Sequence, residues 1–249
     1  MSDLLQISHS DACVEITLNR PKCRNALSRA LIAELTERLR DAGRDDKVRS
    51  VIVTGAPPAF SAGLDLREIA QSTADEAEHD ASALLTLFET VDELAKPVIA
   101  AVNGPAVAGG AGLVSVCDIV VCGRSAIIGY PEIKRGLVAA IVMTYLRRLV
   151  GERQAKYLLL TGENLTAERA VEFGLANEVV SDDELMGRAR HYADMFASYP
   201  PDALCRTKQL WAKLRDMQHA DALREARDLN ATMRLTRESH EGVARFLER

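Results

Sequence analysis

The sequence predicts an α/β protein that ends in a helical region. Short β-branched segments alternate with helix-like segments in the first part of the chain, and almost everything after Asp183 has helical character. Strands separated by helices imply crossover connections and largely parallel pairing. We therefore expect an α/β core over residues 1–195 and a helical C-terminal region over residues 196–249.

The expected strands are short apolar or alternating segments that end at Gly, Pro or Asn. They cover residues 14–19, 50–54, 98–102, 119–122, 127–129 and 179–180. Between and after them, helices are expected over residues 25–43, 83–94, 110–116, 137–150, 152–160 and 166–173. In the helix over 25–43, Ser28 is suited to cap the first turn and Gly43 to end the last one.

Composition excludes several classes of function. The 249 residues carry a net charge of -5 and only 4% aromatic residues, which argues against binding of nucleic acid through its phosphates or by base stacking. The five cysteines form no CxxC pair, and the five histidines show no metal-ligand spacing, so we expect no metal. Neither a membrane span nor a secretory leader is visible, and a cytoplasmic location is expected.

Two turns rich in small residues each follow a predicted strand, at residues 59–66 and 103–112. Each is suited to expose backbone N–H groups at the start of a helix, where an anion is favoured. Two such amides that converge form an oxyanion hole. The spacing alone is equally compatible with ordinary strand-to-helix turns, and neither segment matches a P-loop or a GxSxG motif.

Two further segments carry charged side chains after strands. Glu132 follows the short strand at 127–129 and is a candidate general acid/base, although a surface or capping glutamate is the plainer reading. Residues 19–27 carry three cations, which suit phosphate contacts as well as they suit a solvated basic turn.

Taken in order, these segments resemble the crotonase superfamily, also called the enoyl-CoA hydratase/isomerase family. The matching stretches are NRPKCRNAL at 19–27, FSAGLDLREI at 60–69, VNGPAVAGG at 102–110, CDIVV at 117–121, PEIKRG at 131–136 and EGVARFLER at 241–249. The resemblance implies a crotonase-like spiral of ββα units and an acyl-CoA thioester as substrate. It also implies a homotrimer or homohexamer, with no cofactor other than the coenzyme A of the substrate.

The resemblance assigns roles to particular positions. The oxyanion-hole amides of the family fall on Leu64 and Gly109. The adenine of CoA is expected beside the turn from Ala62 to Leu66. Its phosphates are expected near Arg24 and Arg67, with Lys22 as a further candidate.

One departure from the family bears on the reaction. Hydratases of the family usually hold a water between two glutamates; Glu132 matches the second, but the first falls on Gly112. Loss of one general acid/base costs about 10²–10⁴-fold in rate. A single carboxylate still suffices to move a proton between two carbons, so the sequence favours a Δ3 to Δ2 enoyl-CoA isomerase. The alternatives are a hydratase with a single glutamate and a non-catalytic acyl-CoA-binding protein.

Two segments near these positions are expected to shape the site. The polar stretch over residues 71–82 is predicted to be a mobile flap over the acyl group. The apolar stretch over residues 137–141 is expected to line the wall near Glu132, where it would raise the pKa of that carboxyl.

Overall fold

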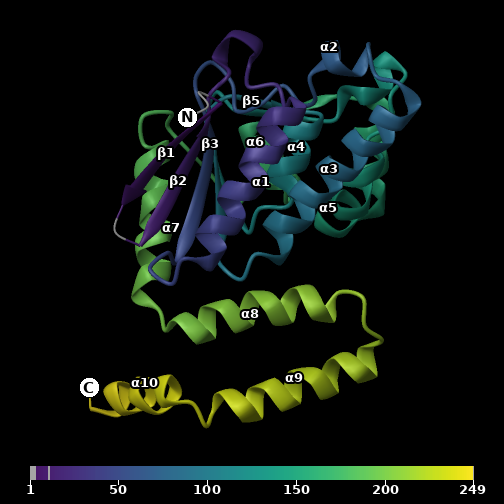
Figure 1. Ribbon diagram of the computed structural model, residues 1–249. Coiled ribbons are helices and arrows are strands. Elements are labelled where there is room, and N and C mark those ends of the chain that lie inside the picture. The colour runs from purple at the N-terminus through teal and green to yellow at the C-terminus, as the bar shows by residue number, and fades with distance from the viewer. Residues whose placement is uncertain (1–3, 11, 249) are drawn as a thin grey trace.

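The computed structural model describes residues 4–10 and 12–248 and contains two β-sheets (Figure 1). The larger sheet has the strand order β1-β2-β3-β4-β6-β9 and the smaller one β5-β7-β8. The strands are β1 (Leu5–Ser10), β2 (Cys13–Leu18), β3 (Ser50–Gly55), β4 (Val98–Val102), β5 (Pro105–Val107), β6 (Ile119–Gly123), β7 (Ile127–Gly129), β8 (Asn164–Thr166) and β9 (Glu178–Val180).

The pairing in the larger sheet is parallel from β2 to β9, as the alternation of strands and helices predicts. Strand β1 was not expected and pairs antiparallel with β2. Only its first residue, Leu5, is buried, although Leu5–Ser8 alternate apolar and polar residues. The three-residue strands β5 and β8 were also not expected; β5 pairs with β7 in parallel and β8 pairs with β7 antiparallel.

Ten α-helices and two short 3-10 helices surround the sheets within the described residues. The α-helices are α1 (Arg29–Arg44), α2 (Leu66–Ile69), α3 (Ala74–Glu93), α4 (Gly109–Ser115), α5 (Ala140–Thr161), α6 (Ala167–Phe173), α7 (Leu185–Ser198), α8 (Pro201–Leu214), α9 (His219–Met233) and α10 (Arg237–Leu247). The 3-10 helices are η1 (Pro21–Cys23) and η2 (Pro131–Arg135).

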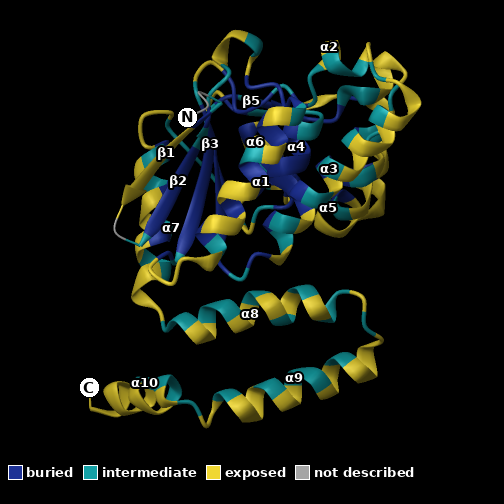
Figure 2. Cartoon of the chain, viewed as in Figure 1, coloured by how far each residue is buried: buried dark blue, intermediate teal, exposed yellow. Residues whose placement is uncertain are grey.

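The larger sheet is buried on both faces because successive strand residues point to opposite sides. Val51 and Val53 of β3 belong to the main core, which also contains the apolar faces of α1 and α3. Ile52 belongs to a second cluster, which α7 closes with Leu185 and Ala189. Figure 2 shows these strands as the buried centre of the chain.

The largest differences from the expected helix boundaries are at the starts of α1, α3 and α5, since residues 25–28 and 137–139 are not helical. Ser28 caps α1, accepting a hydrogen bond from the Leu31 N–H at 3.3 Å, but the helix continues through Gly43 to Arg44. Helix α3 begins at Ala74, because Thr73 and Glu76 form a capping box. Most of the stretch over 71–82 is therefore helix, and its movement over the acyl group stays a prediction.

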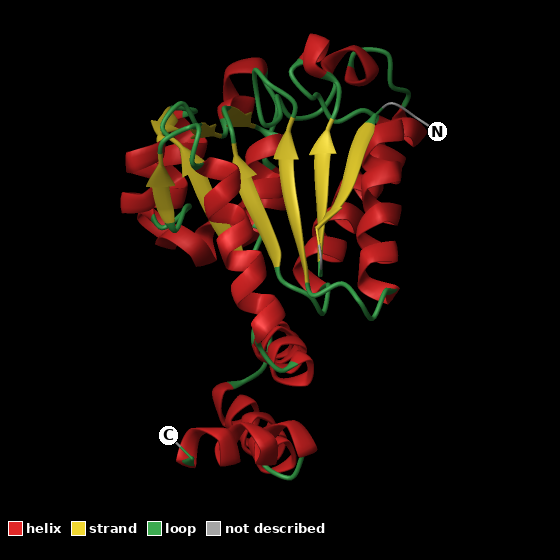
Figure 3. Cartoon of the chain, turned by 90° about the vertical axis from the view of Figure 1, so that its left-hand side faces the viewer, coloured by secondary structure: helices red, strands yellow, loops and turns green. Residues whose placement is uncertain are grey.

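The C-terminal helices extend away from the sheets (Figures 1 and 3). Helix α8 lies along the body and is held there by Lys208, whose Nζ donates to Asp118 Oδ2 at 2.6 Å and to the Val91 carbonyl at 3.0 Å. Helices α9 and α10 lie farther out and contribute no buried residue. The predicted division between residues 195 and 196 stays a prediction.

Within the described part of the chain, no helix combines the length and the apolar character needed to cross a bilayer.

Candidate active site

The two turns that the sequence singles out lie side by side. Ser61 and Ala106 form an isolated parallel bridge, in which the Ser61 N–H donates to the Pro105 carbonyl at 3.1 Å and the Val107 N–H donates to the Ser61 carbonyl at 3.0 Å. A second parallel bridge joins Leu27 to Leu64. The turns over 59–66 and 103–112 thus belong to one site.

The amides of Leu64 and Gly109 are neighbours in this site. A Cβ atom built on Gly109 would lie 3.5 Å from the Leu64 nitrogen, and one built on Gly63 would lie 2.9 Å from the Gly109 nitrogen. Gly63 has φ +83, a backbone conformation that favours glycine. Only glycine at position 63 lets the two amide groups approach so closely without strain.

Neither of the two N–H groups has a hydrogen-bond partner among the described residues, whereas the amides on both sides of Leu64 are used. The Gly63 N–H donates to Ser61 Oγ at 3.3 Å, and the Asp65 N–H donates to the Leu27 carbonyl at 3.1 Å. Two adjacent free donors are the arrangement that stabilises a developing oxyanion.

Ala108 holds the second turn in an uncommon conformation. Its φ of 52 and ψ of -126 lie outside the regions that a non-glycine residue normally occupies. Its N–H donates to the Gly129 carbonyl at 2.9 Å, which ties the turn to β7. Such a residue costs of order 1–3 kcal/mol and persists where the surrounding structure imposes it, frequently at functional sites.

Glu132 lies on η2, three residues after β7. Its Oε2 atom is buried and has no hydrogen-bond partner among the described residues. Burial raises the pKa of this carboxyl, and the Arg135 charge offsets only part of the effect. The neighbouring Tyr130 is fully buried, and its hydroxyl shares a 2.7 Å hydrogen bond with Ser115 Oγ, which joins η2 to α4. A carboxyl with one buried oxygen that lacks a partner is suited to accept and return a proton.

The space above Gly112 is filled by an aromatic ring. A Cβ atom on Gly112 would lie 2.6 Å from Phe88 Cζ and 3.5 Å from Val142 Cγ2. Phe88 is 1% exposed, and its ring packs edge-on against Tyr145 with centroids 6.4 Å apart. A second carboxylate at position 112 therefore has no room beside Phe88.

The candidate CoA-binding residues lie together at the mouth of the first turn. The Ala62 N–H donates to the Arg24 carbonyl at 2.9 Å, while Leu66 and Arg67 are exposed on α2. The side chains of Arg24 and Arg67 form no ion pair with any described residue. By contrast, Arg20 pairs with Asp65 at 3.0 Å, so it is engaged within the fold.

Asn25 supports the first turn in a way that the sequence analysis did not foresee. Its side chain is fully buried, and Nδ2 donates to the carbonyls of Ala56 and Ala59 at 2.8 and 2.7 Å. Its own carbonyl accepts a hydrogen bond from Ser61 Oγ at 2.9 Å. An asparagine between cationic and apolar residues in the stretch over 19–27 was the available signal.

No group of three or more His, Cys, Asp or Glu side chains that could hold a metal is present in the part of the chain that the structure describes.

A family model described as enoyl-CoA hydratase/isomerase matches residues 8–249. The chain belongs to the enoyl-CoA hydratase/isomerase family.

Similar proteins cover the whole chain. A Thermus thermophilus protein named as an enoyl-CoA hydratase is 40% identical over 99% of this chain and 98% of its own length. The 2,3-dehydroadipyl-CoA hydratase of Escherichia coli K12 is 34% identical over 100% of this chain and 97% of its own length. The crystal structure of an enoyl-CoA hydratase from Mycobacterium smegmatis has a TM-score of 0.96 and 32% identity, covering 99% and 97% of the two chains.

These comparisons confirm the predicted family and the predicted fold. The chain is an acyl-CoA enzyme of the enoyl-CoA hydratase/isomerase family. The names of the relatives are those of hydratases, so they give no support to the predicted preference for isomerisation. The roles of individual site residues stay predictions.

Proposed function

We propose that this protein is a 2-enoyl-CoA hydratase that works with a single carboxylate, Glu132. The observation that carries the proposal is the buried and unpartnered Oε2 atom of Glu132, three residues after Gly129, whose carbonyl binds the turn that contains Gly109. The hydratase names of the relatives support addition of water over isomerisation.

In this mechanism the thioester oxygen accepts hydrogen bonds from the N–H groups of Leu64 and Gly109. Ionised Glu132 takes a proton from water while the water oxygen bonds to C3 of the substrate. The electrons of the C2–C3 double bond move toward the thioester, forming an enolate that the two amides stabilise. Protonated Glu132 then gives its proton to C2, which completes the addition of water and restores the carboxylate. The raised pKa of Glu132 favours the protonated form that the second step needs.

A second candidate is the Δ3 to Δ2 enoyl-CoA isomerase. The observation that favours it is the Phe88 ring above Gly112, which leaves an apolar wall where other family members hold water with a second carboxylate. In this reaction Glu132 would remove a proton from C2 and return it to C4 through the same enolate.

Binding of CoA is proposed to use cations whose side chains form no ion pair with a described residue. Arg24 and Arg67 would contact the phosphates, with Ala62 and Leu66 beside the adenine. Such a local basic site reconciles a net charge of -5 with a strongly anionic substrate.

The test is a turnover assay of the purified protein with matched 2-enoyl and 3-enoyl CoA esters of several chain lengths. We expect the kcat/KM for hydration of the 2-enoyl esters to exceed the kcat/KM for conversion of the 3-enoyl esters. Glu132→Gln should lower the kcat/KM for hydration by about 10²–10⁴-fold. Faster conversion of the 3-enoyl esters would establish the isomerase instead. Binding without turnover of either series would establish the non-catalytic acyl-CoA-binding protein.

A further inference from the structure

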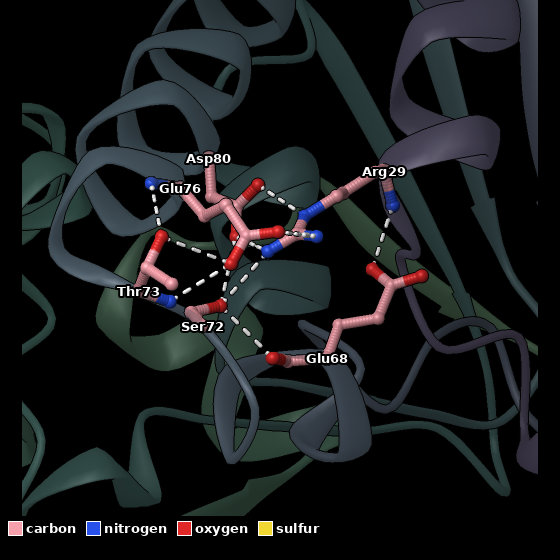
Figure 4. Close-up of polar contacts among 6 residues, drawn as sticks. All are labelled: Arg29, Glu68, Ser72, Thr73, Glu76 and Asp80. Carbon is pink, nitrogen blue, oxygen red and sulfur yellow. Dashed lines mark hydrogen bonds and ion pairs between the residues drawn. The ribbon is translucent and has the colours of Figure 1, made fainter.

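Arg29, the first residue of α1, joins segments that lie far apart in the sequence. Its guanidinium makes a two-pronged ion pair with Asp80 of α3, with Nε 2.6 Å from Oδ1 and Nη2 2.9 Å from Oδ2. Nη1 lies 3.2 Å from Glu76 Oε1, and Nη2 donates to Ser72 Oγ at 2.9 Å. The Arg29 backbone N–H donates to Glu68 Oε2 at 2.9 Å. Figure 4 shows these partners arranged around the guanidinium and the backbone nitrogen of Arg29.

Leu64 lies between the two parts of the chain that this network ties together. On one side, Leu27 donates to the carbonyl of the residue before Leu64 at 2.8 Å and accepts from the N–H of the residue after it at 3.1 Å. Leu27 is only two residues before Arg29. On the other side, Glu68 is four residues after Leu64 and binds the Arg29 backbone. The chain on both sides of the Leu64 amide is thus fixed to the start of α1.

A cavity of about 90 Å³ lies beside this network. Its lining includes Leu27, Leu64, Ile69 and Asp80. Helix α2 has no buried residue, so close packing fixes it less firmly than it fixes the core helices, and the polar contacts of Arg29 hold more of it in place.

We propose that Arg29 is a positioning residue for the oxyanion amide of Leu64. By clamping α2 and the first turns of α3 against α1, it holds the Leu64 N–H next to the Gly109 N–H. In this proposal Arg29 acts through the backbone of Leu64 and not by binding the substrate. The inference rests on the proposed function in one respect, namely that the two amides bind the thioester oxygen.

The chemistry of the clamp, that is, of the ion pair between Arg29 and Asp80, predicts whether its loss changes the stability of the fold or the geometry of the site. The side chain of Arg29 is 39% exposed, and ion pairs at such exposure contribute little to the free energy of unfolding. The planar guanidinium, however, fixes the direction of its two hydrogen bonds to Asp80 in a way that a lysine ammonium does not. Loss of the clamp should therefore change the geometry of the site more than the stability of the fold.

The first test compares Arg29→Lys with Arg38→Lys. Arg38 lies on the same helix and pairs with Asp41 at 3.3 Å, away from Leu64, so it serves as the matched control. Arg29→Lys should lower kcat by about tenfold with KM within about threefold, since a misplaced oxyanion donor costs transition-state stabilisation. Its melting temperature should change no more than that of Arg38→Lys.

Asp80→Asn breaks the same ion pair from the other side and should give the same split between kcat and KM. Because both changes remove one interaction, Arg29→Lys/Asp80→Asn should lose no more kcat than the larger single effect. Equal kcat for Arg29→Lys and Arg38→Lys would overturn the proposal. So would additive losses in the double variant, or a loss of kcat that occurs only together with a loss of folded protein.

The second test needs no turnover and uses the infrared spectrum of bound butyryl-CoA labelled with ¹³C at the thioester carbonyl. Hydrogen bonds from the two amides should lower the carbonyl stretching frequency in the wild type and in Arg38→Lys, and less so in Arg29→Lys and Asp80→Asn. Identical frequencies in all four proteins would contradict the positioning role. A protein that turns over no enoyl-CoA but shows the expected frequency differences would refute the proposed function and retain the role of Arg29.

Discussion

At the scale of the single residue, the position of Glu132 lowers the stability of the fold and suits its carboxyl to proton transfer. Its Oε2 atom is buried without a hydrogen-bond partner in the described structure, and burial raises the pKa of the carboxyl. A buried polar atom that lacks a partner costs free energy that a better-satisfied side chain would not. The cost is understandable if the carboxyl must exchange its proton with a substrate, because a hydrogen-bonded partner would hold it in one state.

The raised pKa of Glu132 predicts the pH dependence of the reaction. Glu132 must be ionised to take a proton, so kcat/KM should fall as the pH falls through its pKa in the free enzyme. Because burial raises that pKa, this acid limb should lie at a higher pH than for an ordinary glutamate. Arg135→Gln removes a charge that lowers the pKa of Glu132, so it should move the limb to still higher pH. A limb at or below the ordinary pKa of glutamate, unmoved in Arg135→Gln, would refute this assignment.

The same burial predicts the effect of Glu132→Gln on stability. Burial raises the pKa of Glu132 above its value in the unfolded chain, so the folded state binds this proton more tightly. The resulting contribution to stability is fully present below the unfolded-state pKa and is lost as the pH rises through the folded-state pKa. At pH 8 the neutral amide should therefore raise the free energy of unfolding and the melting temperature of the protein. Thermal unfolding of both proteins from pH 4 to 8 checks this. The difference should shrink toward pH 4, and a variant less stable at pH 8 would contradict the expectation.

At the scale of the element, the packing of α3 against α4 decides what position 112 can hold. Gly112→Glu alone should destabilise the protein by about 1–3 kcal/mol, the usual cost of overpacking a core. The Phe88 ring occupies the space that the new side chain needs, so this variant should not gain hydration activity. In Gly112→Glu/Phe88→Ala the ring is gone and a second carboxylate fits. Its hydration kcat should exceed that of Gly112→Glu by about tenfold, part of the usual effect of a general acid/base.

Phe88→Ala with the native Gly112 is the control for this pair, since it leaves a cavity where the ring was and adds no carboxylate. Truncation of a buried phenylalanine costs about 3–5 kcal/mol, so rates must be compared at a temperature where all variants are folded. If the double variant hydrates no faster than Phe88→Ala, the second carboxylate gives no advantage at this position.

The helices and strands that the sequence predicts correctly are those whose signals are local. Ser28 caps α1, and the parallel strands β3 and β4 are continuous apolar runs. The start of α3 was placed too late because the first turns of this helix are polar and exposed, although the pair Thr73 and Glu76 is a local capping signal. Strand β1 is short, and only Leu5 and Ile7 give it an apolar alternation; its antiparallel pairing with β2 is a contact that the sequence analysis did not predict.

In the candidate site, too, the residues with a local sequence signal were predicted and those that depend on distant contacts were not. The small residues around Leu64 and Gly109 are visible as turns because glycine and alanine mark close backbone approach. The ring of Phe88 over Gly112 and the contact of Arg29 with Asp80 join residues that are 24 and 51 positions apart. Such pairs follow from the packing of helices, which no local pattern of residues encodes.

At the scale of the whole molecule, the C-terminal helices leave a large apolar surface without a partner. Within the described residues, α8 touches the body and α9 and α10 lie beyond it, as Figure 3 shows. Large apolar side chains are more than half exposed along this region: Trp211, Leu223, Leu235, Val243, Phe246 and Leu247. Several large apolar side chains exposed in one region of a folded protein mark a candidate interface. It supports the proposal that the protein assembles as a homotrimer or a homohexamer.

The assembly can be tested on α10. Phe246 is 75% exposed in the single chain, so a glutamate at this position should be tolerated by the fold of one chain and not by an apolar interface. Light scattering should give the wild type a mass of three or six times 27.2 kDa and Phe246→Glu a smaller mass. Arg38→Glu, an exposed change on α1, should keep the wild-type mass. If the wild type is monomeric, or if Phe246→Glu keeps the full mass, these side chains do not form the interface. A smaller mass with unchanged far-ultraviolet circular dichroism would show that the exposed face of α10 holds the subunits together.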